Sequence, residues 1–451
     1  MLEGTLLLII LILSVLFIIV ATSVLKLHPF FVLLLASFGV GFAVGMPLQK
    51  IIKTINEGFG SLMAYIGLVI IFGTIIGTIL EKSGGAIKIA DVILKLFGKK
   101  KPTLAMSIIG AVVSIPVFCD SGFVILSSLN KAVARRAKVR LATMTVALAS
   151  GLYATHTLVP PTPGPIAAAG NLGASDYLGT VIIVGLITAI PAILVGYWWA
   201  LRIGHSIIIE GENEEVQLEG NSVQNNELPS ALKSFTPIVL PILLISLASV
   251  VKFLEWQGVL ADIILFTGNP LVALFIGLIF SFLLIPVFDQ EHLSGWIGEG
   301  VTHAGPILLI TGAGGAFGSI LKATPLTELI KGLVNNGEIS GVFFILLAFF
   351  VAAALKTSQG SSTAALVITS SLIAPLLPAL HISSPLALSL VVMAIGAGAM
   401  TISHANDSYF WVVTQFSGLQ VNQSYRSYTI ATLLQGVTVL ITTAILYFIF
   451  I

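Results

Sequence analysis

Charged residues are scarce in this chain of 451 residues: only 9% are Asp, Glu, Lys or Arg, whereas 57% are hydrophobic. A soluble domain carries about 25% charged residues, because its surface must face water. So little charge predicts that lipid covers most of the surface of this protein. The formal net charge of +1 provides no basic field for nucleic acid. The single cysteine excludes an internal disulfide and a metal site built from several thiolates.

Long apolar runs are abundant instead, and each is long enough to cross a bilayer as a helix, which takes about 20 residues. They lie at 4–25, 29–48, 61–80, 177–200, 235–254, 260–285, 301–320 and 430–451. Only helices and closed barrels satisfy their backbone in lipid, and these runs are too long and uniform for barrel strands. The sequence therefore predicts an all-α polytopic membrane protein.

Four further apolar stretches, at 103–130, 141–175, 343–380 and 385–417, are interrupted by Pro, Gly and polar residues. Basic residues precede and follow the first stretch, so the positive-inside rule places both of its ends in the cytoplasm. We therefore predict re-entrant hairpins at 103–130 and 343–380, and broken transmembrane helices at 141–175 and 385–417. The same rule predicts that both chain termini lie on the external side.

A polar, acidic stretch at 205–233 predicts a cytoplasmic linker between two similar halves, 1–204 and 234–451. Three short motifs recur in the same order in both halves: GTIL as GSIL, VILSSL as VITSSL, and TH as SH. We expect three spans, an interfacial helix, a hairpin, a broken helix and a final span in each half. This odd number of crossings predicts an inverted repeat, which is typical of secondary transporters with a site at the repeat interface.

We expect the turn of the first hairpin at 119–122, which contains Asp120 beside Ser121 and Gly122. An aspartate at the centre of a membrane costs about 2.5–3.5 kcal/mol on insertion scales, so it normally has a functional or paired role. We favour a proton carrier that belongs to the transport site. The alternative is a structural carboxylate that caps the helix beginning at Gly122.

The tip of the second hairpin is rich in small and hydroxylated residues, namely Gly360, Ser361, Ser362 and Thr363. Helix-start N–H groups and hydroxyls bind anions, so two tips that face each other predict a site for a carboxylate. The alternative is that these hydroxyls bond to their own backbone. Lys356 precedes the tip, where it could pair with the carboxylate of a substrate or extend to an interface.

The two broken helices carry further candidates for binding substrate hydroxyls: Thr155, Thr157, Thr162, His404, Asn406 and Ser408. Four prolines between 160 and 165 cannot continue a helix, so we expect an unwound segment there. Asp407 is a second candidate proton carrier. His156 could titrate near neutral pH, or it could be a neutral, hydrogen-bonded core residue.

Three segments resemble the gluconate permease family: IPVFCDSGFV at 115–124, THTLVPPTPGP at 155–165 and SHANDS at 403–408. These are gluconate:proton symporters of bacterial inner membranes, within the ion-transporter superfamily, and the resemblance covers essentially the whole chain. It implies proton-driven uptake of gluconate or a related sugar acid by a homodimer with an elevator-type mechanism. Some members have Glu where this chain has Asp120, and relatives take D-serine or other hydroxy acids.

We therefore expect a proton-coupled symporter for gluconate or a related small hydroxy monocarboxylate, without a metal or another cofactor. One alternative is a Na⁺-coupled carrier or an antiporter for another organic anion or a D-serine-like substrate, with Na⁺ held by hydroxyls and carbonyls at the hairpin tips. A channel is a further alternative. A membrane-embedded enzyme is the remotest, because the His, Ser and Asp residues lack the spacing of known catalytic motifs.

Overall fold

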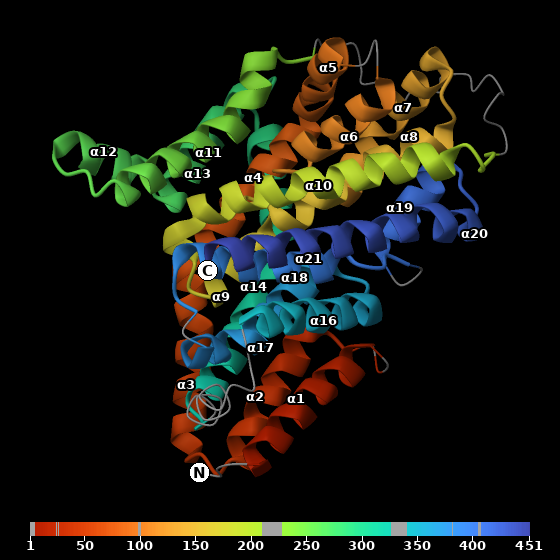
Figure 1. Ribbon diagram of the computed structural model, residues 1–451. Helices are drawn as coiled ribbons and strands as arrows, with labels where there is room; N and C mark the ends of the chain where they lie inside the picture. Colours follow the sequence, from red (N-terminus) through yellow and green to blue (C-terminus); the bar gives the residue numbers. More distant parts are fainter. Residues whose placement is uncertain are drawn as a thin grey trace.

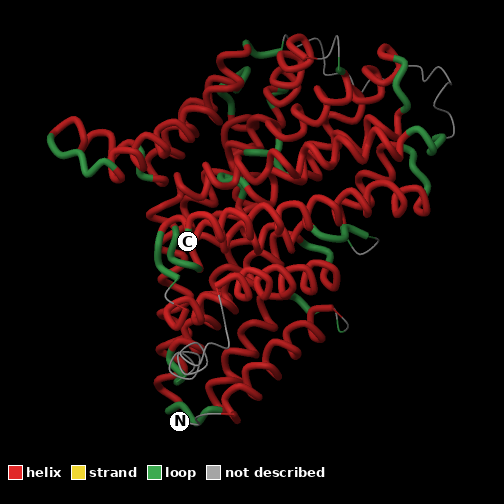
Figure 2. The backbone as a smooth tube through the Cα atoms, in the orientation of Figure 1, coloured by secondary structure: helices red, strands yellow, loops and turns green. Residues whose placement is uncertain are grey.

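The computed structural model describes residues 5–23, 25, 27–97, 101–209, 228–325, 341–380, 382–404 and 407–451. Within these residues every regular element is a helix (Figures 1 and 2). Five of the described helices are long and apolar enough to cross a membrane, and the number rises to seven if two bent pairs each form one span. The all-α polytopic fold predicted from the apolar runs is confirmed.

The chain begins with α1 (Thr5–Ser23) and α2 (Pro29–Ala43), followed by a long helical run of α3 (Leu48–Leu62), η1 (Met63–Gly67) and α4 (Leu68–Lys82). The span expected at 61–80 is therefore part of a longer run that starts at Leu48. Its first part is amphipathic: Ile51 and Ile55 are buried, whereas Lys53 is exposed. This polarity hid the first part of the run from a search for apolar stretches.

The first predicted hairpin contains two helices, α6 (Pro102–Val113) and α7 (Cys119–Ala137), and it follows α5 (Gly85–Phe97), which bends by 71° from α4. The turn occupies residues 114–118, so the expected turn at 119–122 is wrong: these four residues form the first turn of α7. Pro116 lies in the turn, and a proline there removes a backbone donor that a continuous helix would need. Asp120 consequently lies at a helix start rather than in a loop.

The first broken helix consists of α8 (Leu141–Leu158) and α9 (Pro163–Asn171), separated by residues 159–162. The short η2 (Ser175–Tyr177) and the long α10 (Leu178–Gly204) complete the first half. Only the ends of the expected linker at 205–233 are described, because 210–227 lie outside the described residues.

The second half begins with α11 (Ala231–Phe253), α12 (Val259–Thr267), α13 (Pro270–Ser281) and η3 (Phe282–Leu284). The uninterrupted span expected at 260–285 is wrong, because the chain bends by 66° between α12 and the helical run that starts at Pro270. Asn269 accepts a hydrogen bond from the N–H of Leu271, and Pro270 occupies the first turn of α13. A cap followed by proline favours a new helix start at this point.

The next elements are η4 (Glu291–Gly295) and α14 (Trp296–Lys322), and the interfacial helix expected after α14 falls within 326–340, outside the described residues. The second predicted hairpin contains α16 (Gly341–Gln359) and α17 (Ser362–Ile373), followed by η5 (Ala374–Leu380). The second broken helix contains α18 (Pro385–Met400) and α19 (Ser408–Ser417). The chain ends with α20 (Val421–Ser424), η6 (Tyr425–Thr429) and α21 (Ile430–Phe450).

Two helices, α8 and α18, form the centre of the molecule: all residues of α8, and Ala387 to Met400 in α18, are buried. A helix without exposed residues lies in the interior of a helix bundle, where other helices and not lipid surround it. Helices α6 and α10 pack against α8, and α16 and α21 pack against α18. Figure 1 shows α1 to α3 at one end of the molecule and the arm of α11 to α13 projecting from the other. The two halves have a similar order of elements, and their inverted relationship stays a prediction.

Candidate functional site

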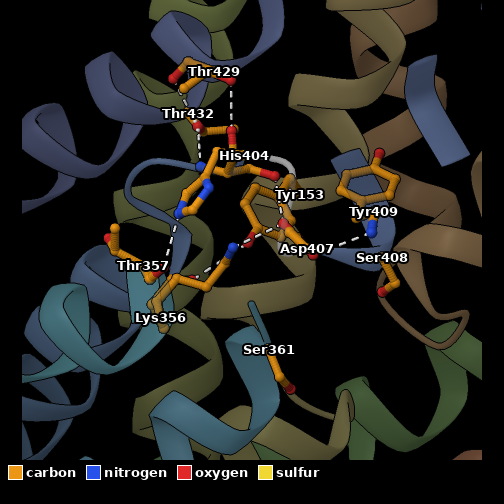
Figure 3. A network of polar contacts seen from close by, with 12 residues as sticks. Tyr153, Lys356, Thr357, Ser361, His404, Asp407, Ser408, Tyr409, Thr429 and Thr432 are labelled. Atoms are coloured by element: carbon orange, nitrogen blue, oxygen red, sulfur yellow. Dashed lines mark hydrogen bonds and ion pairs between the residues drawn. The ribbon is translucent and has the colours of Figure 1, made fainter. Parts of the chain in front are cut away.

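The centre of the candidate site is Asp407, in the unwound segment between α18 and α19. Its side chain is only 5% exposed, and its Oδ1 accepts a hydrogen bond of 3.1 Å from the N–H of Tyr409. Its Oδ2 accepts one hydrogen bond from the ammonium of Lys356 at 2.8 Å and another from the hydroxyl of Ser403. Asp407 therefore caps α19 and also forms a buried ion pair (Figure 3).

Lys356 comes from the last turn of α16, and its side chain is 0% exposed. A buried ammonium is stable only with a charged or strongly polar partner, which Asp407 supplies. A second link lies beside this pair, because Nε2 of His404 donates to the carbonyl of Thr357 at 2.8 Å. The end of α16 and the α18–α19 break are thus joined at two points.

The backbone of the α18–α19 break is anchored from the other side by the C-terminal helices. The N–H of Ser403 donates to Thr432 at 3.0 Å, and the hydroxyl of Thr429 donates to the carbonyl of Ser403 at 2.6 Å. Unwound backbone in a membrane protein needs such partners, because lipid offers none. These contacts hold Asp407 in place while leaving its segment non-helical.

Asp120, in the first hairpin, lies close to the Asp407 segment. It lies in the first turn of α7, where the positive end of the helix favours a carboxylate, and its Oδ1 accepts from the hydroxyl of Ser408 at 3.1 Å. Among the described residues, Asp120 has no Lys, Arg or His within ion-pair distance. Its neighbour Ser121 lies near Glu81 of α4, which adds a further carboxyl group.

The tip of the second hairpin lies across from these groups. Gly360 has a φ of +77°, a left-handed conformation that favours glycine, and it ends α16. Ser361 then caps α17, accepting a hydrogen bond from the N–H of Ala364 at 3.2 Å. Ser362 is buried and lies near Tyr153 of α8, while Thr363 is partly buried.

The structure places the remaining predicted residues in more structural surroundings. The hydroxyls of Thr155, Thr157 and Thr162 are buried and donate to the backbone carbonyls of Ala111, Tyr153 and Val159. His156 is 4% exposed, and within the described part of the chain its Nδ1 has no partner. Gly122 packs against Leu152. Asn406 lies outside the described residues.

A cavity of about 430 Å³ lies at a different place, at the far ends of α9 and α17 from their breaks. Polar groups of Asn171, Ser319, Lys322 and Ser371 contribute to its lining, but none of the predicted site residues does. Asn171 also ties the two helices together by donating to Ser370 at 2.8 Å and to Ser371 at 2.9 Å. The predicted residues thus surround the helix breaks, away from this cavity.

Sequence reasoning missed the contributions of Tyr153, Glu81 and Ser403, and it left the role of Lys356 open. Lys356 did carry a signal, since it is the only charged residue within α16. Tyr153 carried none, because tyrosine is common in membrane helices, whereas Ser403 belongs to the repeated TH/SH motif. Taken together, the site presents one buried ammonium and several carboxyl groups and hydroxyls, a set that can exchange protons and bind a small hydroxylated anion.

Comparison with known sequences gives a consistent result. The family model of the GntP family permeases matches residues 6–449. The gluconate permease of Pseudomonas aeruginosa is 32% identical over 90% of this chain and 89% of the relative. That of Zymomonas mobilis is 32% identical over 98% of both chains. The D-serine transporter DsdX of Escherichia coli is 32% identical over 97% of this chain and 98% of the relative.

Solved structures share the fold at much lower identity. The YdaH transporter of Alcanivorax borkumensis superimposes with a TM-score of 0.68 at 14% identity, covering 94% of this chain and 99% of that chain. MtrF of Neisseria gonorrhoeae gives a TM-score of 0.65 at 16% identity, covering 90% and 84%. With the apolar helices and the match of the family over nearly the whole chain, these findings show a multi-pass membrane transporter rather than an enzyme. The chain belongs to the GntP permease family.

Proposed function

We propose that this permease imports gluconate or a related small sugar acid together with protons across the bacterial inner membrane. The observation that supports this most is the buried Lys356–Asp407 pair, which lies where the breaks of both halves meet. A buried ammonium can bind the carboxylate of a substrate. Carboxyl groups in excess over cations, here Asp120 and Asp407 against Lys356, can take up the coupled proton.

We assign the coupled proton to the group of Asp120, Asp407 and His156, and recognition of the substrate to the polar residues at the breaks. Ser121, Gly122 and the tip at 360–363 would hold the carboxylate. The segments at 155–164 and 403–408 would bind the sugar hydroxyls. The hydroxyls of Thr155, Thr157 and Thr162 donate to backbone carbonyls, so their oxygens are left to accept hydrogen bonds from the substrate.

We further propose that the broken helices move as one body in an elevator-type cycle of a homodimer with external termini. Packing supports a common body, because α7 contacts α8 and α19, α9 contacts α17, and α16 contacts α17 and α18. These contacts link the first and second halves of the chain directly. A rigid unit of this kind can carry a site across the membrane without opening a continuous channel.

D-serine is a second candidate substrate, because one relative of similar identity is named a D-serine transporter. Asp120 supplies the specific observation in its favour, since this carboxylate has no cation among the described residues within ion-pair distance. The ammonium of an amino acid could bind there while its carboxylate binds Lys356. Gluconate has no ammonium group, so a proton would neutralise the Asp120 carboxylate when gluconate is bound.

The test is uptake of gluconate into vesicles reconstituted with the purified protein and free of Na⁺. An imposed pH gradient, acid outside, is expected to drive accumulation, and a protonophore is expected to abolish it. Added Na⁺ should change nothing. Accumulation that requires Na⁺, or that ignores the pH gradient, would reject proton symport. Competition by unlabelled D-serine decides between the two substrates.

A further inference from the structure

We propose that Lys356 is shared between two carboxylates: that of Asp407 in the empty protein and that of the substrate in the loaded protein. Protonation of Asp407 releases the ammonium, which then binds the substrate carboxylate. This inference rests on the proposed function and deepens it, because it names the residue through which substrate binding and proton binding are linked.

The geometry favours exchange over simple addition. The Lys356 side chain is 0% exposed and that of Asp407 is 5% exposed, with 2.8 Å between Nζ and Oδ2. A second carboxylate brought to the same ammonium would place two negative charges around one positive charge, away from water. Like charges at such a site disfavour joint ionisation, so one of the two carboxylates takes a proton. Asp407 is the one already in place.

The exchange leaves the charge of the site unchanged. In the empty state Lys356 carries +1 and Asp407 carries −1, which sums to zero. In the loaded state Lys356 carries +1, the substrate carries −1 and protonated Asp407 is neutral, which again sums to zero. A proton joins a carboxylate oxygen of Asp407, the hydrogen bond from Lys356 to Oδ2 breaks, and a substrate oxygen accepts in its place.

The protein can hold Asp407 in either protonation state. The N–H of Tyr409 donates to Oδ1 at 3.1 Å whether or not the other oxygen carries a proton. The hydroxyl of Ser403 donates to Oδ2 in the ionised state. A hydroxyl can also accept, so Ser403 can accept a hydrogen bond from the O–H of the neutral carboxyl by rotating about its C–O bond. Protonation therefore leaves no orphaned group at Asp407.

Several titratable or charged groups face Asp407 from neighbouring elements. They are Lys356 of α16, Cys119 and Asp120 of α7, Tyr153 and His156 of α8, and Tyr428 of η6. His404 and Tyr409 lie on the segment of Asp407 itself. Of the carboxyl groups, only Asp407 is in contact with Lys356 among the described residues, so only its protonation releases that ammonium.

The exchange also changes how the second hairpin is held. The end of α16 is joined to the α18–α19 break by the Lys356–Asp407 pair and by the hydrogen bond from His404 to Thr357. Release of Lys356 removes the charged one of these two links. Binding of substrate and proton thus weakens the direct contact between the end of α16 and the α18–α19 break. In the loaded form, the substrate carboxylate bound to Lys356 connects α16 to the site instead.

The experiment measures the affinity of the purified protein for gluconate across a range of pH. For the wild type, Kd is expected to rise about tenfold per pH unit on the alkaline side, because each anion binds with one proton. Asp407→Asn is expected to bind gluconate with a Kd that no longer depends on pH. Lys356→Gln is expected to bind at least tenfold more weakly at every pH, roughly the loss of one charged hydrogen bond, and Lys356→Arg is expected to restore part of that loss.

Removing one partner of a buried pair can unfold a protein, so folding is followed by thermal melting. The double variant Lys356→Gln/Asp407→Asn buries no unpaired charge and is expected to fold, yet to bind gluconate at least tenfold more weakly than the wild type. The exposed pair Lys95–Asp91, at 2.9 Å on α5, provides the matched controls Lys95→Gln and Asp91→Asn, which are expected to bind as the wild type does.

The outcomes separate the two proposals. A pH dependence that persists in Asp407→Asn, or unchanged affinity in Lys356→Gln, overturns the exchange while proton symport stands. Absence of any gluconate binding or pH-driven uptake by the wild type overturns the proposed function, and the exchange with it. If Asp120→Asn rather than Asp407→Asn loses the pH dependence, the proton belongs to Asp120 and the exchange is wrong.

Discussion

Ser408 and Asp120 are 288 positions apart in the chain, yet the Ser408 hydroxyl donates a hydrogen bond of 3.1 Å to the Asp120 carboxylate. The contact joins the first residue of α19 to the first turn of α7, and thereby the broken helix of the second half to the hairpin of the first. Both ends of it are polar residues at helix starts. Such a contact can form and break without disturbing the apolar packing around it.

Ser408→Ala removes this hydrogen bond from Asp120. We expect the KM for gluconate to rise about tenfold, since a hydrogen bond to a charged group contributes about 1.5 kcal/mol. The fold should be retained, because Ser408 is exposed and the variant deletes a single oxygen atom. Uptake kinetics in vesicles measure the effect. Ser206→Ala is the control, because that exposed hydroxyl donates to the carbonyl of Ile203 far from the site; an equal loss in both variants would remove the role given to Ser408.

Asp120→Asn tests whether this carboxylate takes part in coupling. The amide has the same shape and can still accept the hydrogen bond from Ser408, but it cannot bind a proton in the relevant range. We expect pH-driven accumulation to be lost, whereas the binding of gluconate keeps the pH dependence that Asp407 gives it, and the variant melts at the temperature of the wild type. Accumulation at the normal level would exclude Asp120 from the coupling mechanism.

Gly110 allows α6 and α8 to approach closely. A Cβ atom at this position would lie 2.6 Å from the carbonyl oxygen of Leu148 and 2.7 Å from the N–H nitrogen of Leu152. Both are backbone atoms of α8, which cannot move away by a change of side-chain rotamer. Gly110→Ala is therefore expected to destabilise the protein by about 1–3 kcal/mol, as overpacking does, and to lower the melting temperature in detergent.

The matched control is Gly39→Ala in α2, where a Cβ atom would meet nothing within 4 Å. Its melting temperature should stay the same or rise, because alanine favours a helix by about 1 kcal/mol over glycine. Equal melting of the two variants would show that α6 and α8 are not packed as described.

Cys119 is a natural reporter of opening at the site. It is the only cysteine of the chain, it is 2% exposed, and it directly precedes Asp120. Reaction with a membrane-impermeant maleimide should be slow at rest, because the reagent cannot reach the thiol. Addition of gluconate at acid pH is expected to accelerate labelling by setting the transport cycle in motion. Fast labelling of the resting protein would contradict the burial of Cys119 at the start of α7.

Much of the fold could be predicted from the sequence, because the features that determine it are local. Apolar runs set the spans, and Pro and Gly near positions 160 and 360 set the breaks of α8–α9 and α16–α17. Errors arose where local signals conflict. Asp120 was expected in a turn because it interrupts an apolar stretch with basic residues at both ends, whereas it lies in the first turn of α7, where the helix start favours a carboxylate.

The site could be predicted only residue by residue. Asp120 and Asp407 stand out as carboxylates in apolar stretches, and Lys356 stands out in the same way. Their pairing could not be predicted, because Lys356 and Asp407 are 51 positions apart and meet only through the packing of α16 against α18. The proximity of Ser121 and Glu81 depends likewise on how α4 and α7 approach each other.

The most direct test of proton–anion symport is the proton movement that accompanies gluconate. Gluconate is added to weakly buffered, Na⁺-free vesicles containing the permease, with a pH dye outside and labelled gluconate to count the anions that enter. We predict that the external medium becomes more alkaline as gluconate enters, with one proton taken up per anion and no response to an imposed membrane potential. Entry of gluconate without proton movement, or only after Na⁺ is added, would contradict the proposed mechanism.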